Sequence, residues 1–241
     1  SKRGITLGSG GGKISSAAST VLTTNALIAS SGYLLTIGST GHTGTVVLGG
    51  TSTYTGGTTV AYGTLKAGAG TSGSVTNGPF GTGTVTVSSG STLDLAGYTI
   101  SNALNLSGTG YSVAALTDSV GSGVASGSVV LAADTSMGGT NSFTVGSGVM
   151  SGGYALTKVG SGTLTLSGAN TYSGGTTVNG GTLKAGRSAS GSVTNGPFGT
   201  GTVTVSSGST LDLAGYTISN ALNLSGTGYS VAALTDSVGS G

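Results

Sequence analysis

A stretch of 51 residues occurs twice in this chain without a single change. Residues 73–123 read GSVTNGPFGTGTVTVSSGSTLDLAGYTISNALNLSGTGYSVAALTDSVGSG, and the same letters return at residues 191–241, at an offset of 118 residues. The similarity continues upstream in weaker form, since TYTGGTTVAYGTLKAG at 53–68 aligns with TYSGGTTVNGGTLKAG at 171–186. Repetition at a fixed period is typical of proteins in which each unit packs on the next.

The repeat determines the expected organisation of the chain. A terminal repeat normally carries a polar cap, whereas Gly241 corresponds to Gly123 inside the array. We therefore expect the chain to be an excerpt of a longer array. It is predicted to form one continuous structure over 1–241, comprising a partial, divergent repeat at 1–72, one full period at 73–190 and the start of the next period at 191–241.

The composition favours short β-strands. Gly makes up 51 of the 241 residues, and in a helix interior Gly is about 1 kcal/mol less favourable than Ala. Pro occurs only twice, which does not fit collagen, and only 5% of the residues are charged, which does not fit a solvated disordered tail. The net charge of +2 comes without a basic run, so we predict no nucleic-acid partner. No apolar run approaches the length of roughly 20 residues that a membrane-spanning helix needs.

Apolar residues alternate with small polar residues along the period. Val85 and Val87 are expected to face inward, with Thr84 and Thr86 on the opposite side. Alternation over a few residues, bounded by Gly, Asn and Ser, is the pattern of a half-buried strand. The same pattern occurs in STLDLAG at 91–97, where Asp94 is expected to face outward, and in GTLTLSG at 162–168.

A β-sandwich, a propeller and a β-solenoid all use short alternating strands. The chain has no Trp, no blade-signature dipeptide and strands shorter than a sandwich usually has. We therefore predict an all-β parallel solenoid, in which each coil needs only a few inward apolar residues and tight Gly corners. With roughly 20 to 24 residues per coil, one period of 118 residues corresponds to about five or six coils.

Three segments carry a resemblance to a known family: GITLGSGGGKI at 4–14, GSGTLTLSGANTYSGGTTVNGGTLKAG at 160–186 and NGPFGTGTVTVSSGSTLDLAG at 195–215. They resemble the autotransporter-associated β-strand repeat, found in the passenger domains of type V secreted proteins of Gram-negative bacteria. The resemblance implies a right-handed parallel β-helix that is exported and displayed at the extracellular side of the outer membrane. Adhesion, aggregation, biofilm matrix or a simple stalk are the roles that it implies.

We accordingly predict a structural and adhesive rod that is not an enzyme and uses no cofactor or metal. The expected partners are neighbouring repeats or copies of the chain itself, stacked head-to-tail into filaments, and cell-surface glycans or proteins. The alternatives are a β-helix that binds or cleaves glycans and an ice-binding solenoid. Ice binding would require regular Thr-x-Thr motifs in consecutive coils, and here they are intermittent.

The residues capable of chemistry are few. His42 is the only His, it has no counterpart in the second copy, and no serine-protease motif accompanies it. The calcium-binding nonapeptide of β-rolls is absent from the sequence. A glycan-cleaving enzyme would need several acids gathered on one face, with Asp94, Asp118 or Asp134 converging in a groove. We instead expect surface acids in water at all five positions: Asp94, Asp118, Asp134, Asp212 and Asp236.

Four residues are candidates for contact with a partner. Tyr54 and Tyr172 occupy equivalent positions in the TY[ST]GG motif, and an exposed Tyr suits recognition because it is both apolar and hydrogen-bonding. The alternative is that each Tyr packs over a corner of the solenoid. Thr84 and Thr86 are the second pair, as outward-facing residues of a strand.

Overall fold

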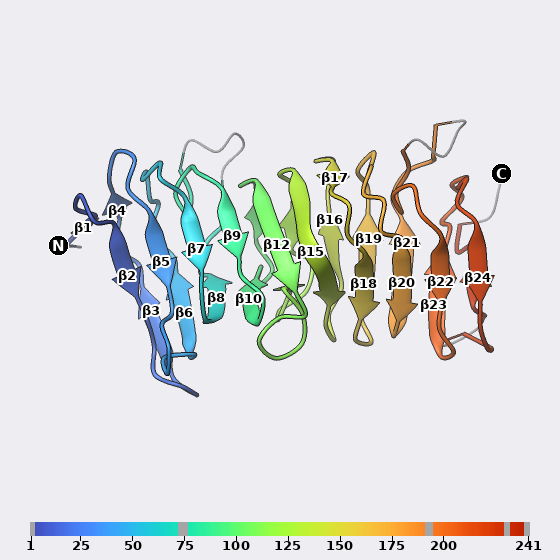
Figure 1. Ribbon diagram of the computed structural model, residues 1–241, viewed down its shortest axis with the longest axis horizontal. Coiled ribbons are helices and arrows are strands. Elements are labelled where there is room, and N and C mark those ends of the chain that lie inside the picture. Colours follow the sequence, from blue (N-terminus) through green and yellow to red (C-terminus); the bar gives the residue numbers. More distant parts are fainter. Residues whose placement is uncertain (1–2, 72–76, 191–194, 229–231, 239–241) are drawn as a thin grey trace.

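The computed structural model describes residues 3–71, 77–190, 195–228 and 232–238. Within these ranges the chain forms 25 strands and no helix. The strands stack into an elongated rod of about 10 turns, with β1 (Ile5–Thr6) and β24 (Leu222–Leu224) near opposite ends (Figure 1). The predicted all-β solenoid is therefore confirmed.

Hydrogen bonding between successive coils joins the strands into three ladders, all of them parallel. The first ladder contains β2 (Gly12–Ile14), β5 (Leu35–Ile37), β7 (Thr58–Val60), β9 (Val85–Val87), β12 (Leu104–Gly108), the start of β15 (Val129–Gly138) and β17 (Met150–Ser151). The second contains β3 (Val21–Thr24), β6 (Thr45–Leu48), β8 (Gly63–Ala67), β10 (Ser91–Asp94), β13 (Leu116–Thr117), the end of β15, β18 (Leu156–Val159), β20 (Thr176–Asn179), β22 (Val203–Val205) and β24.

The third ladder contains β11 (Thr99–Ile100), β14 (Val124–Ala125), β16 (Phe143–Val145), β19 (Thr163–Leu166), β21 (Gly181–Ala185), β23 (Ser209–Asp212) and β25 (Leu234–Thr235). Near the N-terminus β1 pairs separately with β4 (Ile28–Ala29). The ten-residue β15 takes part in both the first and the second ladder, so it turns from one to the other.

The core is formed by stacks of inward-facing apolar residues. On the second ladder Leu65 pairs with Leu93, which pairs with Leu116, and all three side chains are buried. Leu164, Leu166, Val178 and Leu183 are also fully buried, as the alternation predicts. Burial of apolar area stabilises such a stack by about 25 cal/mol per Å². Each coil adds one layer to the same continuous core.

The internal repeat and the coils have different lengths. Five steps along the second ladder lead from Leu65 to Val178, through residues 93, 116, 137 and 158. The sequence repeat, in contrast, maps Leu65 onto Leu183, which lies five residues further on and belongs to the third ladder. One period therefore comprises five coils and one additional strand. Every strand of the second copy lies one ladder further round the rod than its equivalent in the first.

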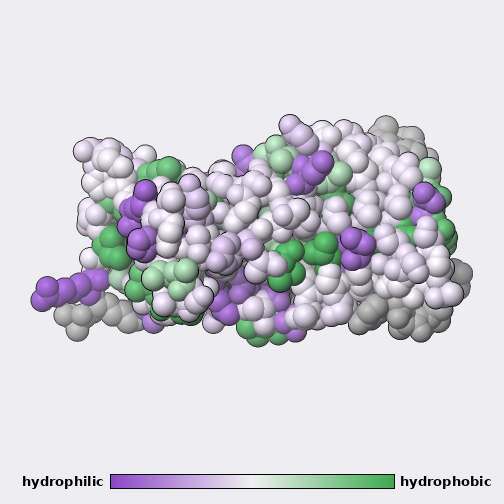
Figure 2. All heavy atoms as spheres, turned by 60° about the horizontal axis from the view of Figure 1, so that its bottom comes forward, coloured by the Kyte–Doolittle hydropathy of each residue, from purple (hydrophilic) through white to green (hydrophobic). Residues whose placement is uncertain are grey.

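The outer surface carries little charge. Figure 2 shows a face of mostly intermediate hydropathy, with separate hydrophilic and hydrophobic side chains among it. This appearance follows from the sequence, because Thr, Ser and Gly occupy most of the positions that alternate with the core residues. Strands with this pattern expose polar but uncharged side chains to water.

Candidate functional site

A groove of about 310 Å³ lies on the outer side of the second ladder, and we call it the first groove. Outward-facing residues of β8, β10 and β13 line it, namely Thr64, Asp94 and Thr117. One wall comes from Ser112 and Val113 in the loop before β13, and the other from the segment 139–141. Gly160, after β18, also lines it, so the first groove is assembled from five successive coils of the rod.

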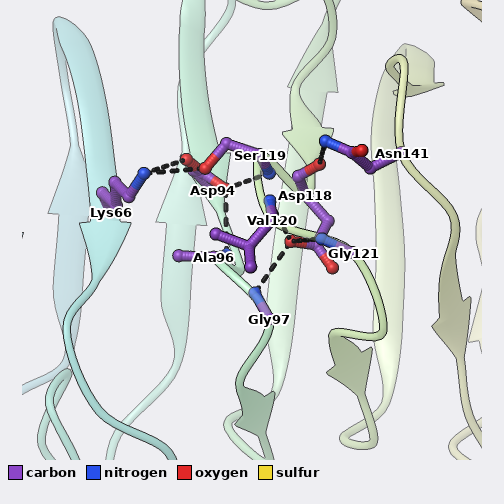
Figure 3. A network of polar contacts seen from close by, with 9 residues as sticks. All are labelled: Lys66, Asp94, Ala96, Gly97, Asp118, Ser119, Val120, Gly121 and Asn141. Carbon is purple, nitrogen blue, oxygen red and sulfur yellow. Dashed lines mark hydrogen bonds and ion pairs between the residues drawn. The ribbon is translucent and has the colours of Figure 1, made fainter.

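Asp94 connects three of these coils (Figure 3). Its Oδ1 accepts hydrogen bonds from the backbone N–H of Ala96 at 2.9 Å and of Ser119 at 2.8 Å. Its Oδ2 lies 3.5 Å from Nζ of Lys66, which also donates a hydrogen bond of 2.7 Å to Oγ of Ser119. The negative charge of Asp94 is therefore paired, and the carboxylate holds two turns in place.

Asp118 holds a turn through four backbone donors, of which Gly97, Val120 and Gly121 are drawn in Figure 3. Its Oδ1 accepts N–H groups of Gly97 at 2.8 Å, Val120 at 3.1 Å and Gly121 at 3.1 Å. Its Oδ2 accepts the N–H of Gly123 at 2.6 Å. Hydrogen bonds to an ionised acceptor are the strongest in proteins, so this carboxylate ties neighbouring coils together.

The prediction of solvated surface acids is wrong for Asp94, Asp118 and Asp212, which are all buried. The physical reason is that turns between coils leave backbone N–H groups without a ladder partner, and a carboxylate satisfies them. Asp134 and Asp236 are exposed, as predicted. Asp134 accepts one hydrogen bond, from the N–H of Ala155 at 2.9 Å.

The structure brings together two of the three acids that an enzyme would need. Asp94 and Asp118 both line the first groove, while Asp134 does not line it. The two carboxylates accept backbone hydrogen bonds, which is a structural role. Across the described ranges no group of three His, Asp or Glu side chains has the spacing of a metal site. The described residues also include no helix long and apolar enough to span a membrane.

The second copy contains the same groove on a different ladder. This second groove, of about 500 Å³, lies over β21, β23 and β25 of the third ladder. Lys184 lies 3.5 Å from Asp212, as Lys66 does from Asp94. Burial acts to raise the pKa of Asp212, but hydrogen bonds from Ser237 and Ala214 and the charge of Lys184 outweigh it. The pKa of Asp212 therefore lies below its ordinary value.

Tyr54 and Tyr172 lie in the core and not at the surface. Both side chains are fully buried, and their hydroxyl groups hydrogen-bond to Oγ1 of Thr58 and Thr176. Burial raises the pKa of both hydroxyls. Both residues therefore pack inside the solenoid, which was the alternative to contact with a partner, and neither ring is accessible at the surface. The sequence could not decide whether these rings are exposed or buried, because the TY[ST]GG motif does not show on which side of the coil each ring lies.

Thr84 is exposed at the turn before β9, and Thr86 is half-buried in that strand. Thr86 continues an outward column of Thr36 and Thr59, and the next residue in that column is Asn105. The column is thus one residue wide and three Thr long, which is unlike a flat Thr array. Contact of Thr84 or Thr86 with a partner stays a prediction.

Two exposed Tyr residues beside the first groove were not singled out from the sequence. Tyr62 and Tyr111 are 43% and 48% exposed. The hydroxyl of Tyr62 accepts a hydrogen bond of 3.5 Å from Thr40, and that of Tyr111 lies 3.0 Å from Oγ1 of Thr43. The turn that anchors them also contains His42, which is exposed. A comparison of the two copies could have drawn attention to Tyr62, because the equivalent residue of the second copy is Gly180.

Lys158 is buried among apolar residues. It faces inward between Met137 and Val178 on the second ladder. Its Nζ donates three hydrogen bonds to backbone carbonyl oxygens, to Val159 at 3.0 Å, Gly160 at 2.8 Å and Gly180 at 2.9 Å. Burial lowers the pKa of Lys158 to about 8. From inside the core, the ammonium group thereby links the backbone of two successive coils at the turns that follow β18 and β20.

The comparisons with known proteins agree with this architecture. The family model of the passenger-associated-transport-repeat matches residues 43–67 and 156–185, which carry β6 to β8 and β18 to β21. No curated protein and no solved structure matched the chain. The predicted resemblance to autotransporter passenger domains is confirmed by the two matches. The chain is therefore a β-solenoid in which two regions match the family model of the passenger-associated-transport-repeat.

Proposed function

We propose that this rod is displayed outside a Gram-negative cell and acts there as a structural and adhesive element, in aggregation or in a biofilm matrix. The observation that carries the proposal is the recurrence, in both copies of the repeat, of a groove lined by equivalent Thr, Ser and Asp residues. The carboxylates of the first groove hold turns, and Thr and Ser side chains supply the rest of its polar lining. Repeated weak contacts of this kind produce avidity without a deep pocket.

Surface display tests this function directly. The chain is fused to a translocator and displayed on a Gram-negative strain that does not aggregate, and antibody labelling confirms that it reaches the surface. We expect faster settling of the culture and thicker surface films than with the translocator alone. Equal settling and equal films, with the chain fully displayed, would contradict the proposal.

Self-association through the ends of the rod is the second part of the proposal. Leu222 and Leu224 of β24 are 36% and 43% exposed, whereas their equivalents Leu104 and Leu106 are buried beneath β15. At the other end Val21 of β3 is also exposed. Open strand edges with apolar residues are templates for further strands. The purified chain is therefore expected to form head-to-tail filaments.

Electron microscopy of the purified chain at increasing concentration tests the filaments. The matched variant carries Leu222→Lys and Leu224→Lys, which place charge on the open end without altering any buried layer. We expect filaments that lengthen with concentration for the unaltered chain and single rods for the variant. Single rods for both at the highest concentration would show that the ends do not associate.

A further inference from the structure

We propose that the first groove, together with Tyr62 and Tyr111, is a binding site for a neutral oligosaccharide chain. This inference rests on the adhesive function proposed above, and it identifies the ligand class and the residues. It depends on four properties of the groove: its size, its charge balance, its hydroxyl groups and the two aromatic rings at its edge.

The two Tyr residues adjoin lining residues of the groove along the chain. Tyr62 stands two residues before the lining residue Thr64, and Tyr111 immediately precedes the lining residue Ser112. The backbone N–H of Tyr111 donates a hydrogen bond of 3.0 Å to Oγ1 of Thr92, which fixes the start of this loop over β10. Both Tyr residues therefore adjoin the groove along the backbone, and their hydroxyls extend to Thr40 and Thr43 in the coil before β8.

Both rings are held in place before any ligand arrives. The hydroxyls of Tyr62 and Tyr111 reach the same turn, through Thr40 and Thr43. The latter contact connects residues that are 68 positions apart in the sequence, so it depends on the stacking of coils. Tyr offers a large contact area and loses little conformational entropy on binding, and a fixed ring loses still less.

The charges of the groove favour an uncharged ligand. Lys66 is paired with Asp94, and Asp118 accepts four backbone N–H groups. An unpaired cation, which would attract a phosphate or a sulfated chain, is not among the residues that line the groove. The hydroxyls of Thr64, Thr117 and Ser112 can both donate and accept hydrogen bonds.

A sugar chain matches this combination. Its ring hydroxyls need donors and acceptors in alternation, and its C–H faces pack against aromatic rings. Ligand sites commonly combine apolar or aromatic walls with a few placed polar groups. The volume of about 310 Å³ suits a short segment of a chain that continues beyond the groove along the surface.

The test measures binding of the purified chain to an immobilised panel of neutral oligosaccharides built from glucose, galactose, mannose or N-acetylglucosamine, with heparin as the anionic comparison. We expect binding to at least one neutral oligosaccharide that changes little between low and high salt, because no net charge is involved. Tyr111→Ala and Tyr62→Gly, the second of which reproduces the second copy, are each expected to weaken that binding at least about tenfold.

Two control variants separate this site from a general effect. Tyr98→Ala removes a ring that is 40% exposed and stands directly before β11, on the third ladder and not on the second ladder that carries the groove, so it is expected to leave binding unchanged. Tyr111→Phe keeps the ring and loses only the bond to Thr43, so a smaller loss of about two- to threefold is expected. Thermal unfolding of each variant verifies that the rod is intact.

Three outcomes would overturn the inference: no neutral oligosaccharide on the panel binds, only heparin binds and salt removes it, or Tyr62→Gly and Tyr111→Ala bind as well as the unaltered chain. These outcomes are distinct from a failure of the proposed adhesive function. Displayed rods that aggregate cells although the panel is blank would reject the oligosaccharide site alone. Rods that bind a neutral oligosaccharide but leave cells dispersed would reject the role in aggregation alone.

Discussion

At the scale of single residues, the buried polar side chains connect neighbouring coils. Lys158 occupies a core position where the equivalent residue of the first copy is Ile37, and it gives three hydrogen bonds to carbonyl groups of two coils. A charged group in such a place is unfavourable unless it is paired or hydrogen-bonded. Burial opposes the ammonium form here, while the three carbonyl groups favour it.

Stability is therefore expected to depend on pH through Lys158. Its pKa is about 8 in the folded chain and 10.5 in the unfolded chain, so between these values the unfolded chain binds more protons and stability rises with pH. We expect a gain of about 2 kcal/mol between pH 7.5 and pH 9.5, measured by chemical denaturation. The variant Lys158→Ile, which introduces the residue that the first copy has at this position, is expected to lack this gain. A rise of the same size in the variant would show that Lys158 is not its source.

Above about pH 10 the opposite trend is expected from two buried hydroxyl groups. Burial raises the pKa of Tyr54 and Tyr172, so the folded chain keeps protons that the unfolded chain loses. Stability should accordingly fall as the pH rises through the unfolded pKa of 10.0. In Tyr54→Phe and Tyr172→Phe the decline is expected to be smaller, as seen by denaturation at pH 10 and pH 11. An unchanged decline in the double variant would contradict this assignment.

Asp118 and Asp134 form a matched pair for testing how carboxylates hold the turns. Asp118 is buried with four backbone donors, whereas Asp134 is exposed with one. Asp118→Asn replaces one acceptor oxygen by a donor that faces N–H groups, and we expect a loss of about 2–4 kcal/mol. Asp134→Asn is expected to lose less than about 1 kcal/mol. Equal losses in thermal or urea unfolding would exclude the structural role assigned to Asp118.

At the scale of elements, the turns between strands depend on Gly residues with positive φ. Gly63 begins β8 with a φ of 70°, and a Cβ built on it would lie 2.5 Å from the carbonyl oxygens of Gly44 and Thr43 in the coil beneath. Gly90 has a similar φ of 79°, but a Cβ there would meet nothing within 4 Å. The first corner thus requires Gly for two reasons and the second for one.

Substitution at these corners separates backbone strain from crowding. Gly90→Ala introduces only the strain of positive φ and is expected to destabilise by about 1 kcal/mol. Gly63→Ala adds a clash with the neighbouring coil and is expected to destabilise by about 2–3 kcal/mol. Urea unfolding of both variants measures the difference. A Gly63→Ala variant no less stable than Gly90→Ala would mean that the coils do not approach as closely as the structure has them.

The strands themselves could be predicted from the sequence, whereas contacts between coils could not. Val85, Val87 and Leu164 were assigned to the core by period-two alternation, because a strand has two sides and only one is apolar. Alternation assigned Asp94 to the outside correctly, but its burial depends on a loop that lies 18 or more residues later. The partner of Tyr111 is 68 residues away. Which residues meet between coils depends on the length of each coil. This length varies from 19 residues, between Thr45 and Thr64, to 28 residues, between Gly63 and Ser91, so such contacts could not be predicted from the sequence.

At the scale of the whole molecule, the coil is the unit that can be removed. Leu93 pairs with Leu116, 23 residues later, so deletion of residues 93–115 takes out one complete circuit and leaves Leu116 facing Leu65. The same deletion brings β9 next to β15, because both pair with β12 in register. A solenoid is stabilised mainly by nearest-neighbour contacts and should tolerate this loss.

We expect the chain without residues 93–115 to keep a cooperative unfolding transition and the circular dichroism of a β-protein. Deletion of residues 93–104 removes about half a circuit, displaces every later strand from its ladder and is expected to abolish cooperative unfolding. The two transitions are compared by thermal scanning. Cooperative unfolding in both variants, or in neither, would contradict a structure built from interchangeable coils.

The mismatch between sequence period and coil has a consequence for any array built from this unit. Each copy is turned by one ladder out of three relative to the copy before it, so equivalent side chains follow a screw along the rod. Only every third copy presents the same side, and a flat surface lying along such a rod meets each copy in a different orientation. Equivalent side chains of successive copies in such an array would therefore face different directions around the axis of the rod.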